Sequence, residues 1–111
     1  EIRTLRARES NPTVRPGSAA YDGRYGVPTF DEVLALAAAA PRPVGVYPET
    51  KHPTYFRREG RRLDGTPIGL DISQMLIDAL VAARFTDPAR VSIQSFEIEN
   101  LIDLKRRILP A

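Results

Sequence analysis

Two side chains of opposite charge, Glu49 and Lys51, end a short apolar run in the sequence Val-Gly-Val-Tyr-Pro-Glu-Thr-Lys at positions 44–51. The run is rich in β-branched and aromatic residues, which predicts a buried strand. Pro48 has no N–H to donate, so it marks the point where strand pairing stops. Because side chains alternate along a strand, Tyr47, Glu49 and Lys51 are expected on one side.

This placement fits the active-site chemistry of α/β enzymes, which gather functional groups at the carboxyl ends of strands. A carboxylate such as that of Glu49 can bind a hard cation, and the ammonium group of Lys51 can neutralise phosphate oxygens. An ion pair that caps a strand end has the same residue pattern. The residues alone leave both interpretations open.

Composition narrows the class of protein. The 111 residues suffice for one modest domain, and 42% hydrophobic with 27% charged residues is ordinary for a globular protein. The net charge of +2 predicts no general affinity for nucleic acid, and the absence of cysteine excludes disulfides and thiol chemistry. No apolar run approaches the roughly 18 residues of a transmembrane segment. The sequence starts at Glu1 rather than at Met, so we expect that a targeting segment can precede it in the full-length protein.

Helical periodicity predicts three clear helices. The first covers about 29–40, opened by a capping box of Thr29 and Glu32. The second covers about 71–84, with an apolar stripe of Ile72, Met75, Leu76, Ala79, Leu80 and Ala83. The third follows Ser95 as its cap, with an inward stripe of Ile98, Leu101, Ile102 and Ile108.

The remaining elements are shorter. Residues 1–8 have the pattern of a helix tail, and strands are predicted over 44–49 and 91–94. Strands that alternate with helices imply parallel pairing, and two parallel strands alone make a poor sheet with two open edges. We therefore expect an α/β segment of a larger protein, with further strands before residue 1 and after residue 111.

The sequence resembles the glycerophosphodiester phosphodiesterases, in particular their exported bacterial branch. The most specific part is Val-Tyr-Pro-Glu-Thr-Lys at 46–51. Glu-Ile-Arg-Thr-Leu at 1–5, Pro-Thr-Phe-Asp-Glu-Val at 28–33 and Gln-Ser-Phe at 94–96, followed by Leu101, resemble three further family motifs in the same order.

The resemblance implies a fold and an activity. The fold would be a phospholipase C-like (β/α)₈ TIM barrel, of which 1–111 would be the central segment of one domain, incomplete at both ends, with about two strands and three to four helices. The activity would be metal-dependent hydrolysis of a small-molecule glycerophosphodiester to an alcohol and glycerol 3-phosphate, in lipid and glycerol metabolism. The branch implies a periplasmic or extracellular location. The remainder of the barrel chain would be the partner of this segment.

The resemblance also implies roles for single residues. Glu49 would be a ligand of Ca²⁺ or Mg²⁺, and Lys51 would be a catalytic and substrate-binding residue at the phosphate. The family's two catalytic histidines lie earlier in the barrel, so the segment alone is expected to be inactive. The alternative is a barrel that has lost these histidines and binds a phosphodiester or a partner protein without catalysis.

Several residues keep two interpretations. Phe96 and Gln94 either contact the glycerol moiety or belong to the core, and Tyr55 either lines the alcohol pocket or packs its loop onto the barrel. His52 is the only histidine of the chain and is interpreted as a loop residue at the mouth of the site. The loop arginines at 57, 58, 61 and 62 either attract anionic headgroups or form a solvated charge run. Nucleic-acid binding is not expected, because interleaved stacking aromatics are missing.

Overall fold

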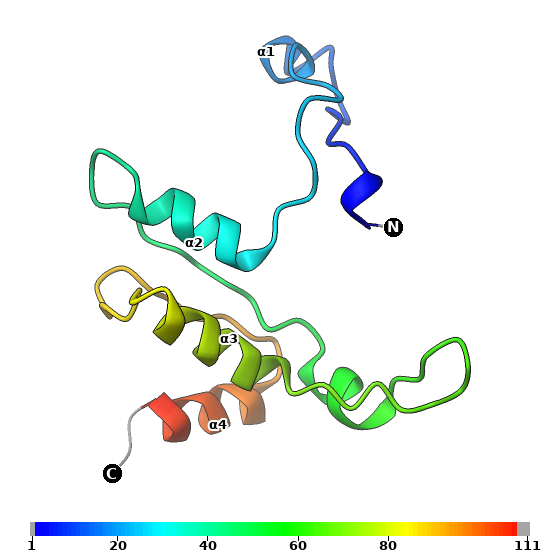
Figure 1. Ribbon diagram of the computed structural model, residues 1–111, viewed down its shortest axis with the longest axis vertical. Coiled ribbons are helices and arrows are strands. Elements are labelled where there is room, and N and C mark those ends of the chain that lie inside the picture. The colour runs from blue at the N-terminus through cyan, green and yellow to red at the C-terminus, as the bar shows by residue number, and fades with distance from the viewer. Residues whose placement is uncertain (1, 109–111) are drawn as a thin grey trace.

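The computed structural model describes residues 2–108, which form a mostly helical chain (Figure 1). Its elements are the 3₁₀ turn η1 (Ile2–Thr4), α1 (Pro16–Ala19), α2 (Phe30–Ala38), the π-helical turn η2 (Tyr55–Glu59), α3 (Ile72–Ala82) and α4 (Ile98–Ile108). The three predicted helices are confirmed as α2, α3 and α4. The helix tail expected over 1–8 was wrong for the described residues, which form only η1, and Glu1 lies outside them.

The capping box at the start of α2 is confirmed. The Thr29 hydroxyl accepts a hydrogen bond from the Glu32 N–H at 3.3 Å, and the Glu32 carboxylate accepts one from the Thr29 N–H at 2.7 Å. The Thr29 bond and then the guanidinium of Arg3 lower the pKa of Glu32 below its usual value. α2 ends at Ala38, two residues earlier than predicted.

Two extended segments, 44–50 and 90–96, run parallel, in agreement with the pairing that alternating strands and helices imply. Their parallel bridges join two residue pairs, Val46 with Val91 and Glu49 with Gln94. Both pairs have the same offset along the sequence, so the register is constant. The prediction of two strands is nevertheless corrected, because the described residues contain isolated bridges and no continuous strand.

The cause of this interruption is a single missing hydrogen bond. The backbone bonds between the segments run from Val46 N to Arg90 O, Ser92 N to Val46 O, Gln94 N to Pro48 O and Thr50 N to Gln94 O, at 2.8–3.1 Å. The regular series also needs a bond from residue 48 to the Ser92 carbonyl, and Pro48 has no N–H to donate. The ladder therefore breaks at its centre and resumes in the same register.

A small apolar core lies between these segments and the helices α2 and α3. Its buried residues are Leu34, Ala37, Leu76, Leu80 and Phe85, with Val44, Val46, Val91 and Ile93 packed against them. Arg90 extends this core by stacking its guanidinium 4.3 Å from the centroid of the Phe85 ring. The same group donates to the carbonyl oxygens of Val44 at 2.9 Å and Ala37 at 3.3 Å, so it joins the end of α2 to the start of the extended segment.

Two predicted apolar stripes were partly wrong. In α4 the buried residue is Leu104, whereas the predicted inward residues are exposed: Ile98, Leu101, Ile102 and Ile108. In α3, Leu76 and Leu80 are buried, but Met75 is 55% exposed. α3 contacts α2 and α4, whereas α4 contacts α3, and in both helices only part of the apolar stripe is covered.

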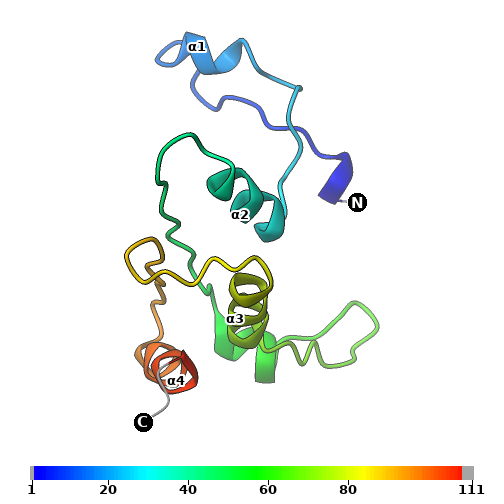
Figure 2. The ribbon, with the colours of Figure 1, turned by 60° about the vertical axis from the view of Figure 1, so that its left-hand side comes forward.

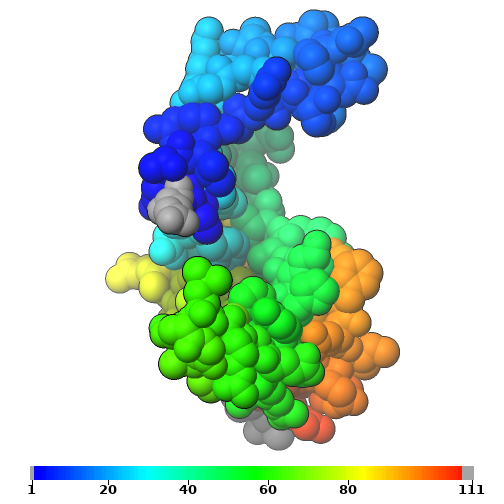
Figure 3. Space-filling model, turned by 90° about the vertical axis from the view of Figure 1, so that its right-hand side faces the viewer, coloured from blue at the N-terminus to red at the C-terminus, as the bar shows by residue number. Residues whose placement is uncertain are grey.

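The chain exposes much more surface than a compact protein of its mass. Its accessible area is 8832 Å², against about 6,100 Å² for a folded monomer of 12.3 kDa. Figure 2 shows one reason: the arm, residues 2–28, extends away from the layer of helices. In the space-filling view of Figure 3 the arm projects above the rest of the molecule, while its first residues, in dark blue, reach down to the body. We call residues 29–108 the body.

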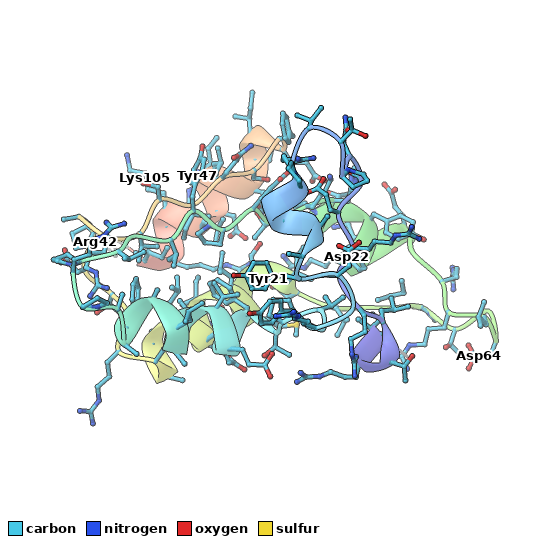
Figure 4. All side chains as sticks on the ribbon, turned by 90° about the horizontal axis from the view of Figure 1, so that it is seen from above. Tyr21, Asp22, Arg42, Tyr47, Asp64 and Lys105 are labelled. Carbon is cyan, nitrogen blue, oxygen red and sulfur yellow. The ribbon has the colours of Figure 1, made fainter. Side chains whose placement is uncertain are left out.

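A hairpin projects from the body between η2 and α3. It is closed by the bridge of Arg61 with Pro67 and by the hydrogen bond from Arg62 N to Thr66 O at 2.8 Å. At its tip Leu63 is fully exposed, and Asp64 lies at the outer end of the molecule in Figure 4.

Candidate functional site

Burial alternates along the first extended segment, as predicted. Val44, Val46 and Pro48 are partly buried and Thr50 is buried, whereas Tyr47, Glu49 and Lys51 are exposed. Tyr47 is 69% exposed and lies on the side of the segment opposite to α2 (Figure 4). The predicted functional residues therefore share the face that the helices leave bare.

The parallel register adds one residue to this face. Gln94, which is half-buried, is the bridge partner of Glu49, and the last backbone bond between the segments joins Thr50 N to Gln94 O, so Phe96 lies just beyond the paired residues. Phe96 is 83% exposed, although it is large and apolar. Glu49 and Gln94 are thus found side by side, a carboxylate and an amide, whereas Lys51 and Phe96 follow directly after the paired residues of the two segments.

Tyr55 has a different setting. It lies in η2, where its ring makes an edge-to-face contact with Phe56 at a centroid distance of 5.6 Å. A Cβ atom added at Gly60 would come within 2.8 Å of the Tyr55 ring, so the ring covers this buried glycine closely. These contacts account for Tyr55 by loop packing, and its role at the alcohol stays a prediction.

The backbone directly after Lys51 has an unusual conformation. His52 has a φ of 53°, in the left-handed region that residues with a Cβ seldom adopt. Pro53, which follows, is buried, and the His52 carbonyl accepts a hydrogen bond from Phe56 N at 3.2 Å. Backbone strain of this kind is typical of functional loops, where the surrounding structure maintains it.

Thr50, between Glu49 and Lys51, belongs to a buried polar network that the sequence analysis missed. The Thr50 hydroxyl donates to Asn100 Oδ1 at 2.7 Å, and Asn100 Nδ2 donates to the Ser73 hydroxyl at 2.5 Å. Thr50 is 4% and Ser73 2% exposed. A possible signal was the hydroxyl of Thr50 at an inward position of the alternating segment, where an apolar residue is the rule.

The loop arginines do not act as one group. Arg57 forms an ion pair with Asp71 at 3.6 Å, whereas within residues 2–108 Arg58, Arg61 and Arg62 form no salt bridge. Asp71 also caps α3 by accepting from Gln74 N at 3.0 Å. Partial burial raises the pKa of Asp71, but the Gln74 bond and the guanidinium of Arg107 outweigh it, so the pKa lies below its usual value.

Cavities flank the paired segments on both edges. One of about 710 Å³ is lined by 45–50 together with α2 and α3, and one of about 620 Å³ is lined by Val91, Ile93, α3 and α4. On the first edge, Tyr47 N and Glu49 N donate to no backbone carbonyl among the described residues. Each edge thus has open space with largely apolar walls.

Two further findings concern ligands and membranes. Among residues 2–108, no three His, Asp or Glu side chains are grouped closely enough to hold a metal ion. Because hard cations take six or more oxygen ligands, a cation at Glu49 would need further ligands from outside these residues. No helix in the same range is long and apolar enough to cross a bilayer.

Comparison with known proteins finds a partial relative. No family model matches the chain, and no solved structure matches it. The chain is 37% identical over 65 residues to glycerophosphodiester phosphodiesterase GDPD6 of Arabidopsis thaliana. The match covers 59% of the chain but only 17% of the relative, so the chain spans about a sixth of that protein. It does not support the exported bacterial branch. Over part of its length, the chain is thus homologous to a glycerophosphodiester phosphodiesterase.

Proposed function

We propose that the chain is the central segment of a glycerophosphodiester phosphodiesterase barrel, which hydrolyses a glycerophosphodiester to an alcohol and glycerol 3-phosphate. The observation that carries the proposal is the parallel register, which pairs Glu49 with Gln94 on the bare face, with Lys51 and Phe96 two residues further along each segment. The partial identity to a phosphodiesterase supports the same reaction.

Each residue has a role that follows from its chemistry. Glu49 would provide one carboxylate ligand for Ca²⁺ or Mg²⁺, which when bound would supply charge stabilisation for the phosphoryl oxygens. Lys51 neutralises a second phosphoryl oxygen. Gln94 and Phe96 contact the glycerol moiety by hydrogen bonding and packing, and Tyr55 borders the alcohol. The other metal ligands and the proton-transferring histidines come from the rest of the barrel.

The open edges of the paired segments support a barrel. Parallel strands need neighbours and covered faces, and Tyr47 N and Glu49 N donate to no backbone carbonyl among the described residues, so the first segment has an unpaired edge. The large exposed area of the chain agrees with this. The rest of the barrel chain would cover both edges.

The test is hydrolysis by the full-length protein. Release of glycerol 3-phosphate from a glycerophosphodiester is measured with Ca²⁺, with Mg²⁺ and after chelation. Glu49→Gln should lower turnover by orders of magnitude and weaken the metal dependence, and Lys51→Ala should mainly lower kcat. The matched controls are Glu59→Gln on the nearby turn and Lys105→Ala, the only other lysine. Unchanged turnover in Glu49→Gln would refute the metal-ligand role, and a Lys51→Ala variant that loses only thermal stability would make Lys51 structural.

A binding barrel without catalysis is the second candidate. It differs from the first candidate in the histidine pair, because a full-length protein without two histidines at the site would lack the groups that transfer protons in hydrolysis. In that case the full-length protein would bind a glycerophosphodiester in calorimetry but release no glycerol 3-phosphate, and Glu49→Gln would abolish the binding.

A further inference from the structure

The loop that carries Lys51 is attached at both of its ends to the start of α4. We propose that Glu97 and Asn100 act as a clamp, positioning Glu49 and Lys51 for the reaction; this inference rests on the proposed phosphodiesterase function. Glu97 directly precedes α4 and Asn100 lies in its first turn. At a spacing of three residues the two side chains lie on the same side of the helix.

Asn100 holds the first end of the loop. Its amide connects the hydroxyl of Thr50, at 2.7 Å, to the hydroxyl of Ser73, at 2.5 Å. Ser95 adds a hydrogen bond from its hydroxyl to the Thr50 carbonyl at 3.3 Å. Within the described residues no buried side-chain polar atom lacks a partner, so this network is complete. A complete buried network fixes one geometry, because losing any member leaves another unsatisfied.

Glu97 holds the second end. Its carboxylate accepts from Thr54 N, at 3.3 and 3.4 Å for its two oxygens, and from the Thr54 hydroxyl. Hydrogen bonds to a charged acceptor are stronger than neutral ones. Residues 50 and 54 are thus both fixed to α4, four residues apart.

His52 lies midway between the two attachment points. Its φ of 53° is unfavourable for a residue with a Cβ, so the loop needs contacts that hold this conformation. The two contacts of the clamp provide them, while the side chains of Lys51 and His52 stay exposed. Because Glu49 and Lys51 flank Thr50 directly, a shift of Thr50 would displace both, and displacements near 1 Å can cost about 100-fold in rate.

Steady-state kinetics of the full-length protein test the clamp. Thr50→Val removes the hydroxyl at constant size, and Asn100→Ala removes the amide; each should lower kcat about tenfold or more, with KM changed less than about threefold. Thr50→Ser keeps the hydroxyl and should restore the wild-type kcat. Arg107→Ala is the matched control. Arg107 lies in α4, as Asn100 does, but its ion pairs are with Asp71 and Asp103 and not with residues 50–54. Arg107→Ala should lower Tm and leave kcat unchanged. If kcat of the folded Thr50→Val and Asn100→Ala proteins stays at the wild-type value, the clamp is refuted.

A second readout does not depend on hydrolysis. Amide hydrogen exchange at residues 50–54 should accelerate about tenfold or more in Asn100→Ala and in Glu97→Ala, but not in Glu97→Gln or Arg107→Ala. Glu97 is only partly buried, so its variants are expected to fold even if Asn100→Ala does not. If the wild-type protein releases no product, the proposed function fails, and exchange alone decides the clamp. Unchanged exchange in both alanine variants would overturn it.

Discussion

The body and the arm show two ways in which this chain holds its residues in place. The body has a core, with Leu34 completely buried between the helices and the extended segments. The arm has no buried residue, and its stacked rings of Tyr21 and Tyr25 are 50% and 60% exposed. Of its charged pairs, Arg8 with Asp22 at 3.8 Å is mostly exposed, and Arg15 pairs at 2.8 Å with Glu9, whose side chain is covered. The comparison teaches that the site loop is positioned by buried contacts, whereas the arm depends on polar contacts without an apolar core, and exposed ion pairs contribute little.

The largest effect should come from the core of the body. Leu34→Ala removes a side chain that is 0% exposed, and it should lower the free energy of unfolding by about 2–5 kcal/mol because it leaves a cavity. Leu36→Ala in the same helix changes a residue that is 75% exposed, and it should cost less than about 0.5 kcal/mol. Chemical denaturation of the full-length protein gives both values. Equal losses would contradict the assignment of Leu34 to the core.

A smaller loss of unfolding free energy is expected at Arg90, which joins the end of α2 to the first extended segment. Arg90→Ala removes hydrogen bonds to Val44 O and Ala37 O and the contact with the Phe85 ring. Because a charged donor to a partly buried acceptor contributes about 1.5–3 kcal/mol, the loss in unfolding free energy should lie in that range. Arg42→Ala is the control, because Arg42 is exposed in the turn between α2 and the first extended segment. If Arg90→Ala loses no more unfolding free energy than Arg42→Ala, Arg90 does not hold α2 and the extended segment together.

Acid should weaken the body through Asp71. The pKa of this carboxyl is lower in the folded protein than in the unfolded one, so its charge stabilises the fold above the unfolded value of about 4. This stabilisation is lost as the pH falls below that value towards the folded pKa. Asp71→Asn keeps a capping side chain and removes the charge, so wild type should be the more stable at pH 7 and the difference should shrink below pH 4. Unfolding free energies measured from pH 2 to 7 check this, and a constant difference would refute it.

The smallest effect is expected between the arm and the body. Arg3 and Glu32 form an ion pair at 2.9 Å, but their side chains are 65% and 51% exposed. Arg3→Ala should therefore leave Tm unchanged within error in low and in high salt. A salt-dependent drop in Tm would show that the arm is attached more firmly than its exposure indicates.

Local patterns in the sequence predicted the helices well. The capping box at Thr29 and the helical period of 71–84 depend on residues three or four apart; the box and the helix are found, although Met75 of the predicted stripe is exposed. The alternation that puts Glu49 and Lys51 on one face depends on neighbours two apart, and it is also found. The roles of these two residues stay predictions.

Contacts between distant residues were not predictable in this way. Thr50 and Asn100 are 50 positions apart, and Arg90 and Val44 are 46 apart, so no periodicity connects them. The same holds for the burial of Leu104 in place of its apolar neighbours, which depends on how α4 crosses α3. The sequence indicated that strand pairing stops at Pro48. That the ladder resumes after Pro48 could not be predicted, because it depends on how the partner segment 90–96 is aligned.

The hairpin with Leu63 at its tip has a consequence for limited proteolysis. Arg61 and Arg62 directly precede this fully exposed residue, and exposed loop tips are the preferred sites of nicking. Within the body, trypsin should therefore cut first between Arg62 and Leu63. The cut separates Leu34 from Leu76 in the covalent chain but not in the core that they share, so the two fragments should co-elute under native conditions and separate only in denaturant.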